Sequence, residues 1–314
     1  MATPAAPQPL AHADDTDMVP IPAGTFLMGS EDFYPEESPV RPATVEAFLI
    51  DRTPVTNAQF ARFVEETGHV TFAEIAPDPR DYPGMDPALA VPGSIVFTPP
   101  DRPVRLDGPP IWWSFVIGAD WRHPLGPGSS IADIPDHPVV HVGYTDALAY
   151  AAWAGKQLPT EAEWERAARG GLDGAAYAWG DSFEPDGQRM AKTWQGAFPH
   201  ANAAEPGLER TSPVGSYPAN GFGLFDMIGN VWEWTEESVA SRGEGGCCAG
   251  LPPAPQGGPQ ERVLKGGSHL CAPEYCRRYR PAARWLQPVD TTTSHVGFRC
   301  IRRLAGTAPQ QERD

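Results

Sequence analysis

Residues 266–280 read Gly-Gly-Ser-His-Leu-Cys-Ala-Pro-Glu-Tyr-Cys-Arg-Arg-Tyr-Arg, and this stretch constrains the fold more than any other. It holds two cysteines, Cys271 and Cys276. On a helix their spacing turns the side chains roughly 140° apart, and on a strand it puts them on opposite faces. The sulfurs can meet only where the backbone bends, and Pro273 lies between them to favour a bend. The stretch therefore predicts a tight loop that serves a disulfide, a thiol relay or a two-coordinate soft metal.

The composition predicts a folded but loop-rich protein. The 314 residues are 41% hydrophobic, which suffices for one large core or two modest domains. The 32 glycines and 37 prolines predict many turns and long irregular connections. The net charge of −16 argues against nucleic-acid binding, and it suits either a basic peptide partner or solubility alone. No apolar stretch approaches the ~18 residues of a membrane span, so we expect none.

We expect one domain over residues 18–304. Residues 1–17 lack the charged and apolar regions of a secretory signal and predict a disordered leader, and residues 305–314 predict a disordered tail. The five cysteines are an odd number, so at least one thiol is unpaired. Cys247 and Cys248 lie in a glycine-rich loop with no assigned role. We expect a cytoplasmic monomer.

Helix and strand signals together predict an α+β domain with little regular secondary structure. Three segments carry helix signals, with a glycine at the end of each and a capping box at the start of the first and third: 56–68, 145–155 and 160–170. Strand patterns predict a hairpin and three single strands: 18–29, 44–52, 263–266 and 295–304. Beyond residue 172 the chain reads mostly as short segments between glycines and prolines.

The histidines give little support to a metal site. His137 and His141 flank Pro138, which favours a strand, and a strand would hold the two rings roughly 13 Å apart. A structural role is therefore the better interpretation. The sequence has no His-x-His or His-Glu-x-x-His motif, no nucleotide-binding glycine loop and no Gly-x-Ser-x-Gly.

Residues 226–233 predict either a calcium loop or a structural turn. Asp226 and Glu233 are hard oxygen donors, and Gly229 between them permits a turn that aims carbonyl groups inward. In the alternative, both acids are solvated and the neighbouring tryptophans pack into the core. The residues alone leave both alternatives open.

Three interpretations compete for the cysteine pair. A structural disulfide is unusual in a reducing cytosol. A zinc site needs two more ligands, and the adjacent Cys247 and Cys248 make a poor chelate. Two thiolates also suit Cu(I), which accepts linear coordination and stays open to a third sulfur. Four arginines nearby either favour the thiolate or pair with acidic residues: Arg277, Arg278, Arg280 and Arg284.

Five stretches together resemble one family, the formylglycine-generating enzymes, which are sulfatase-modifying oxidases. They are GGSHLCAPEYCRRYRPAAR, NGFGLFDMIGNVWEWT, ADWRHPLGP, DHPVVHVGYTDALAYAAWAGKQLPTEAEWERAARGG and HVGFRCIRR. The resemblance covers nearly all of residues 18–304, in order. It implies a single compact domain related to the C-type-lectin-like fold.

The resemblance also implies an activity. Such enzymes use dioxygen to oxidise a cysteine in a sulfatase Cys-x-Pro-x-Arg motif to Cα-formylglycine, through a thioaldehyde, with a thiol reductant. It implies that Cys271 and Cys276 bind Cu(I), that Ser268 is an active-site serine, and that Trp232 and Tyr275 are aromatic neighbours of the substrate. Ala272 stands where some relatives have a histidine.

For calcium, the resemblance implies one site, with Asp226 and Glu233 binding by their side chains and Gly229 and Val231 by their carbonyl groups. A second calcium site of the family is doubtful in this chain. Its asparagine and aspartate positions read Lys192 and Pro206. A lysine ammonium could replace the charge of that ion.

Two rival functions remain. A sulfoxide-forming oxygenase of the same superfamily would need a histidine-rich iron site, and a non-catalytic peptide-binding module would not need both cysteines.

Overall fold

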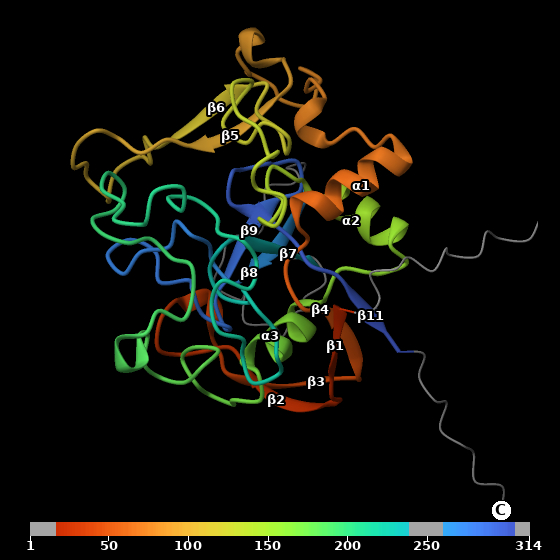
Figure 1. The fold of residues 1–314 in the computed structure, drawn as a ribbon, viewed down its shortest axis with the longest axis vertical. Coiled ribbons are helices and arrows are strands. Elements are labelled where there is room, and N and C mark those ends of the chain that lie inside the picture. The colour runs from red at the N-terminus through yellow and green to blue at the C-terminus, as the bar shows by residue number, and fades with distance from the viewer. Residues whose placement is uncertain (1–16, 239–259, 305–314) are drawn as a thin grey trace, which may run out of the picture.

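The computed structural model describes residues 17–238 and 260–304. The predicted tail, all but the last residue of the predicted leader, and the loop with Cys247 and Cys248 lie outside these ranges. Within them, no helix is long and apolar enough to cross a bilayer. The described chain is a mixed α+β domain in which long irregular segments connect short strands and helices (Figure 1).

The N-terminal strands pair with distant partners. Strand β1 (Met18–Ile21) pairs antiparallel with β4 (Phe48–Asp51), which also pairs with β11 (Ile301–Arg303). Strand β2 (Gly24–Met28) pairs with β3 (Arg41–Val45). The predicted hairpin over 18–29 is therefore wrong, and so is a single strand over 44–52. Alternation of apolar residues defines which face of a strand is buried, but it does not choose the partner strand.

A four-stranded sheet in the order β10-β7-β8-β9 lies in the middle of the domain (Figure 1). Its members are β7 (Trp232–Ser238), β8 (Glu261–Lys265), β9 (Arg284–Pro288) and β10 (Val296–Gly297). The predicted strand over 263–266 is confirmed as part of β8. The predicted strand over 295–304 is in fact two strands, because the chain leaves β10 and joins the sheet of β4 as β11. A separate ribbon pairs β5 (Gly93–Phe97) with β6 (Trp113–Ile117).

All three predicted helices are confirmed: α1 (Asn57–Thr67), α2 (Tyr144–Trp153) and α3 (Glu161–Arg169). Capping boxes start α1 at Thr56 and α3 at Thr160, and left-handed Gly68 and Gly170 end them. Helix α2 starts one residue earlier than predicted and ends before Gly155. The described ranges also contain short 3₁₀ turns: η2 (Pro35–Glu37), η3 (Phe72–Glu74), η4 (Pro87–Leu89) and η5 (Pro185–Gly187).

Two apolar clusters fill the described part of the domain. The larger packs the three helices against the strands of the two main sheets. The smaller surrounds the segment after the Gly-Gly-Ser turn and is rich in aromatic rings: Phe97, Trp112, Trp194, Phe198, Leu270 and Ala272. The residues around the cysteines are therefore packed from one side by aromatic side chains.

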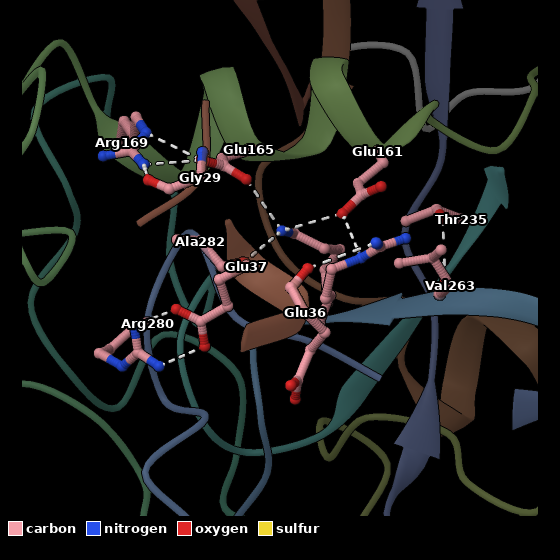
Figure 2. A network of polar contacts seen from close by, with 12 residues as sticks. Gly29, Glu36, Glu37, Glu161, Glu165, Arg169, Thr235, Val263, Arg280 and Ala282 are labelled. Atoms are coloured by element: carbon pink, nitrogen blue, oxygen red, sulfur yellow. Dashed lines mark hydrogen bonds and ion pairs between the residues drawn. The ribbon is translucent and has the colours of Figure 1, made fainter. Parts of the chain in front are cut away.

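On its other side, the same part of the chain is held by buried ion pairs beneath α3 (Figure 2). Lys265 Nζ at the end of β8 lies 2.9 Å from Glu165 Oε2, and Arg284 Nε at the start of β9 lies 2.9 Å from Glu161 Oε1. Arg280 makes two hydrogen bonds with Glu37, and both side chains are almost fully buried. These pairs fix both ends of the segment between β8 and β9, which carries the two cysteines.

Candidate functional site

The two cysteines meet on a single backbone turn. The N–H groups of Tyr275 and Cys276 both donate to the carbonyl oxygen of Ala272, at 3.1 and 2.8 Å, and Pro273 is the first residue inside the turn. The turn brings Cys271 Sγ within 3.0 Å of Cys276 Sγ, and both residues are free thiols. The predicted bend is confirmed, and two sulfurs lie side by side.

Glycines let neighbouring segments approach this turn closely. Gly266 and Gly267 have φ of 92° and 73°, which favour glycine. A Cβ on Gly267 would lie 2.6 Å from the carbonyl oxygen of Arg278. The Trp194 N–H also donates to the Cys271 carbonyl at 3.0 Å, which ties the turn to the segment that carries the aromatic cluster.

The sulfurs border a cavity of about 460 Å³. All five predicted catalytic and substrate-contacting residues line it: Ser268, Cys271, Cys276, Trp232 and Tyr275. Arg278, one of the four arginines named from the sequence, also lines it, whereas sequence reasoning missed several other lining residues: Trp112, Trp113, Phe198 and His295. Within this set Trp112 and Trp113 are adjacent in sequence, and a Trp-Trp pair in an otherwise loop-rich region is a signal that could have found them.

Ser268 has a defined hydrogen-bond geometry. Its Oγ accepts from the N–H of Leu270 at 3.2 Å and lies 3.0 Å from Nδ1 of His295. Its own N–H donates to Cys271 Sγ at 3.5 Å. Burial lowers the pKa of His295 to about 3, so the imidazole is neutral and its Nδ1 can accept a hydrogen bond from the serine hydroxyl. The serine is thereby coupled to a cysteine through its backbone and to a histidine through its side chain.

Aromatic rings shape the cavity wall. Tyr275 is 39% exposed and stacks on Phe198 with ring centroids 4.5 Å apart. Trp112 meets the same tyrosine edge to face at 5.3 Å. Trp232 is buried, and its backbone N–H donates to the carbonyl oxygen of His295 at 2.9 Å. Tyr275 is the partly exposed member of this group, which suits contact with an incoming chain.

The two thiols differ in acidity. Burial raises the pKa of Cys271, whereas the hydrogen bond with Cys271 lowers the pKa of Cys276 to about 7, helped by Arg278. Arg278 is the arginine that acts on the thiolate. Arg280 instead pairs with Glu37 of η2 and Arg284 with Glu161 of α3, which is the alternative role predicted for them. Near neutral pH Cys276 is therefore partly ionised and carries the negative charge of the pair, while Cys271 stays protonated.

The donor set fits a soft monovalent metal. Two sulfurs face one cavity, and no cluster of three or more His, Cys, Asp or Glu residues that could bind a metal occurs in ranges 17–238 and 260–304. Zinc in a structural site needs four ligands, whereas Cu(I) accepts two thiolates. Cys271 and Cys276 could therefore hold Cu(I), and the cavity leaves room for a further sulfur.

Residues 226–233 fit calcium in part. Asp226 is buried, and its backbone has a left-handed conformation. Among the described residues its carboxylate accepts hydrogen bonds from neutral groups, the N–H of Gly215 at 2.6 Å and Asn230 Nδ2 at 3.4 Å. Burial raises its pKa to about 6. The carbonyl groups of Gly229 and Val231 accept no hydrogen bond from any described residue. Gly229 and Val231 therefore offer free carbonyl oxygen atoms, and Asp226 offers a carboxylate whose hydrogen bonds come from neutral groups.

Glu233 fits calcium less well. Its carboxylate accepts hydrogen bonds from Arg299 at 2.8 to 3.0 Å and from Trp164 Nε1 at 2.7 Å. Its charge is thus balanced by an arginine. A calcium ion at this loop would have to share Glu233 with Arg299.

Lys192 stands where the resemblance implies an asparagine ligand of the doubtful second calcium site. Lys192 is 2% exposed, and its Nζ donates to the carbonyl oxygen of Leu208. Leu208 lies two residues after Pro206, which stands at the aspartate position of that site. Burial lowers the pKa of Lys192. The lysine is therefore placed where it could take over the charge of an ion.

The structural interpretation of two histidines is supported. His137 Nδ1 lies 2.9 Å from Thr211 Oγ1, and His141 Nδ1 lies 2.7 Å from Ser94 Oγ. Both residues are buried, and their rings have separate hydrogen-bond partners.

The chain resembles known proteins over nearly its whole length. The family described as "Sulfatase-modifying factor enzyme 1-like domain" matches residues 3–304. A formylglycine-generating enzyme from Mycobacterium tuberculosis is 56% identical, with 91% of this chain and 97% of that protein covered. One from Thermomonospora curvata is 48% identical, with 90% and 92% covered. The solved structure of PvdO from Pseudomonas aeruginosa has a TM-score of 0.58 at 25% identity, with 96% of this chain and 100% of that chain covered.

Proposed function

This chain belongs to the sulfatase-modifying factor enzyme 1-like family, and from that premise we propose that it is a formylglycine-generating enzyme whose chemistry is carried by Cys271 and Cys276. The enzyme is an oxidoreductase, and its clients are sulfatases. The client cysteine lies in a Cys-x-Pro-x-Arg motif. One observation carries the assignment of the site: two free thiols lie 3.0 Å apart at the wall of a cavity that has room for a client side chain.

Cu(I), when bound by the two sulfurs, would supply a soft centre that accepts the client sulfur and dioxygen. The residues of this chain have separate tasks. The turn at Ala272 presents both sulfurs in one direction, and the ion pairs beneath α3 keep that turn in place. Holding reacting groups in one geometry is worth several kcal/mol of barrier. Electrons for the reduction of dioxygen to water come from the client cysteine and from a thiol reductant; water then hydrolyses the thioaldehyde, and hydrogen sulfide leaves.

The Ser268 hydroxyl, oriented by His295, is suited to donate a hydrogen bond beside the sulfurs. The neutral imidazole accepts at Nδ1, and the serine hydroxyl can donate there or turn toward the cavity. Trp232 and Tyr275 give the cavity an apolar wall that excludes water around the client's CH₂ group. Exclusion of water favours orderly oxidation over side reactions.

Mass spectrometry tests the proposal. A peptide with a Cys-x-Pro-x-Arg motif is incubated with the protein, dioxygen, a thiol and Cu(I). We expect a mass loss of about 18 units, because the product loses hydrogen sulfide and gains one oxygen atom. The Cys300→Ser variant is a matched control, since Cys300 is buried and does not line the cavity. Absence of the −18 product with wild-type protein would refute the function.

The two rivals are weaker. A sulfoxide-forming oxygenase would need several histidines at one metal, and His295 is the one histidine among the described residues that line the cavity. A non-catalytic peptide-binding module has no use for two free thiols at the same cavity. Conversion of the peptide by wild-type protein separates this module from an enzyme.

We also propose one structural calcium ion, bound by Asp226, Gly229, Val231 and Glu233, the last shared with Arg299. The ammonium of Lys192 would stand in for a second ion. Metal analysis of protein refolded with calcium tests this: one ion per chain is expected, and two would refute the role of Lys192. A cytoplasmic location, the monomeric state and the absence of nucleic-acid and membrane partners stay predictions.

A further inference from the structure

The ribbon of β5 and β6 begins at the cavity and reaches the periphery of the molecule (Figure 1). Ile95 of β5 and Trp113 of β6 line the cavity beside the sulfurs. Strand β6 reads Trp-Ser-Phe-Val-Ile from Trp113 to Ile117. It therefore contains neither a charged residue nor a proline.

The hydrogen bonds of β5 show which edge of β6 is open. The N–H of Ile95 donates to the Thr292 carbonyl at 3.2 Å, and the Ile95 carbonyl accepts from Ser294 N–H at 3.0 Å. The backbone of Ile95 therefore points away from β6, so its pair with Phe115 is a non-hydrogen-bonded pair. By the same alternation, the backbone N–H and C=O of Phe115 point away from β5, toward the outer edge of β6.

No described residue satisfies those groups. In ranges 17–238 and 260–304, no hydrogen bond outside the strand ladder reaches the N–H or C=O of Phe115. An open edge of this kind can pair with another strand, and proteins usually protect it with a charge, a proline or a covering segment. The sequence of β6 offers neither of the first two.

The side chains add an apolar face to the open edge. Trp113, Phe115 and Ile117 alternate along β6 and share one face with Ile95. Phe115 is 37% exposed and Ile117 is 57% exposed. Single exposed apolar residues are common on surfaces, but these two continue a face that starts in the cavity.

We propose that the outer edge of β6 binds the client polypeptide by strand addition. The occupant is an extended segment of the sulfatase next to the cysteine to be oxidised. Its backbone pairs with the N–H and C=O of Phe115, and its apolar side chains lie over Phe115 and Ile117. Main-chain hydrogen bonds provide affinity in this mode and alternate side chains provide selectivity. The five residues of β6 span roughly 17 Å, enough for a short client strand.

This inference rests on the proposed function, because it needs a polypeptide client. Continuity with the cavity supports it, because Trp113, where β6 begins, lines the same cavity as the two cysteines.

Steady-state kinetics with two peptides test the proposal. The short peptide contains only the Cys-x-Pro-x-Arg motif, and the long one carries about six further residues on each side. In Phe115→Ser and Ile117→Ser we expect KM for the long peptide to rise about tenfold with kcat unchanged, and both constants for the short peptide to stay as in wild type. Leu172→Ser is the matched control, since Leu172 is 41% exposed and does not line the cavity.

The backbone contact has its own test. Phe115→Pro removes the outward N–H but no hydrogen bond to β5, and Phe115→Leu keeps that N–H. We expect KM for the long peptide to rise more in the proline variant than in the leucine variant. Thermal melting identifies variants that fail to fold, and a series of long peptides with single N-methylated residues then tests the same hydrogen bonds on wild-type protein.

An unchanged KM for the long peptide in both serine variants would overturn the proposal, and so would equal rises for both peptides. Failure of the proposed function looks different, because wild-type protein would then convert neither peptide. In that case, fluorescence anisotropy of the labelled long peptide on wild type and Phe115→Ser still tests the edge: equal affinities overturn it, and a tenfold difference supports it.

Discussion

The segment between β8 and β9 has two contrasting sides. Toward α3, buried charges are matched: Lys265 with Glu165, Arg284 with Glu161 and Arg280 with Glu37. Toward the cavity, two thiols lie among aromatic rings. The buried ion pairs of the first side fix the position of the segment, and the cavity on the second side leaves the sulfurs accessible. We call the first the paired side and the second the reactive side. Because both belong to one segment, the position of the two sulfurs depends on the ion pairs that hold the segment in place.

Arg278 lies between the two sides. Its guanidinium pairs with Glu36 and lies 3.9 Å from the Tyr34 ring centroid and 4.8 Å from that of Trp285. It also helps to lower the pKa of Cys276. The ion-paired side therefore reaches the thiols through one arginine.

The largest expected effect comes from the reactive side. In Cys271→Ser and in Cys276→Ser, kcat/KM for a motif peptide should fall by at least about 10⁴-fold, or ~5.5 kcal/mol of barrier, because the two sulfurs act as a unit. Peptide conversion measured by mass spectrometry checks this. Activity within tenfold of wild type in either variant would contradict the assignment of the chemistry to the side of the segment that carries the two sulfurs.

The paired side should respond in stability. Arg280→Met leaves Glu37 buried without its partner, and burial already raises the pKa of that carboxyl group. We expect a loss of about 3–5 kcal/mol in the free energy of unfolding, measured by urea denaturation. Arg105→Met is the control, because its pair with Asp107 is exposed to solvent and should contribute little to stability.

A double variant sharpens this prediction. Adding Glu37→Leu to Arg280→Met removes the unpaired charge and should restore most of the lost stability. Equal stability of the single and double variants would show that lost packing, and not an unpaired charge, causes the change.

A smaller effect concerns Asp226. Its pKa rises from 3.8 to about 6 in the folded protein, so the calcium-free fold binds a proton that the unfolded chain does not bind between these values. Stability should therefore rise as pH falls from 7 to 5, by about 1 kcal/mol at this residue. Asp226→Asn should lack this rise, and added calcium should remove it from wild type. Parallel stability profiles of the two calcium-free proteins would contradict the assignment.

The smallest effect concerns Arg278. In Arg278→Met the pKa of Cys276 should rise above about 7, by about half a pH unit, because a neighbouring cation is lost. The rate of alkylation of Cys276 against pH, followed by peptide mass mapping, measures this shift. Arg277→Met is the control, since Arg277 is a neighbouring arginine that is not among the groups that shift the pKa of Cys276. An unshifted profile would remove Arg278 as the link between the two sides.

The sequence predicted those parts that depend on neighbouring residues. Thr56 and Thr160 mark helix starts because a capping box is local, and Pro273 marks the bend that joins the sulfurs. Strand partners were mispredicted, since β1 and β2 pair with residues farther along the chain. His295 was missed for the same reason: its link to Ser268 spans 27 positions.

Copper binding tests the central claim most directly. A competition titration with a Cu(I) chelator measures the ions held per chain by wild type, Cys271→Ser, Cys276→Ser and Cys300→Ser. The account predicts one tightly bound Cu(I) in wild type and in Cys300→Ser, and a loss of tight binding in the other two variants. Tight stoichiometric binding that survives in either cavity variant would contradict the assignment of the reactive side.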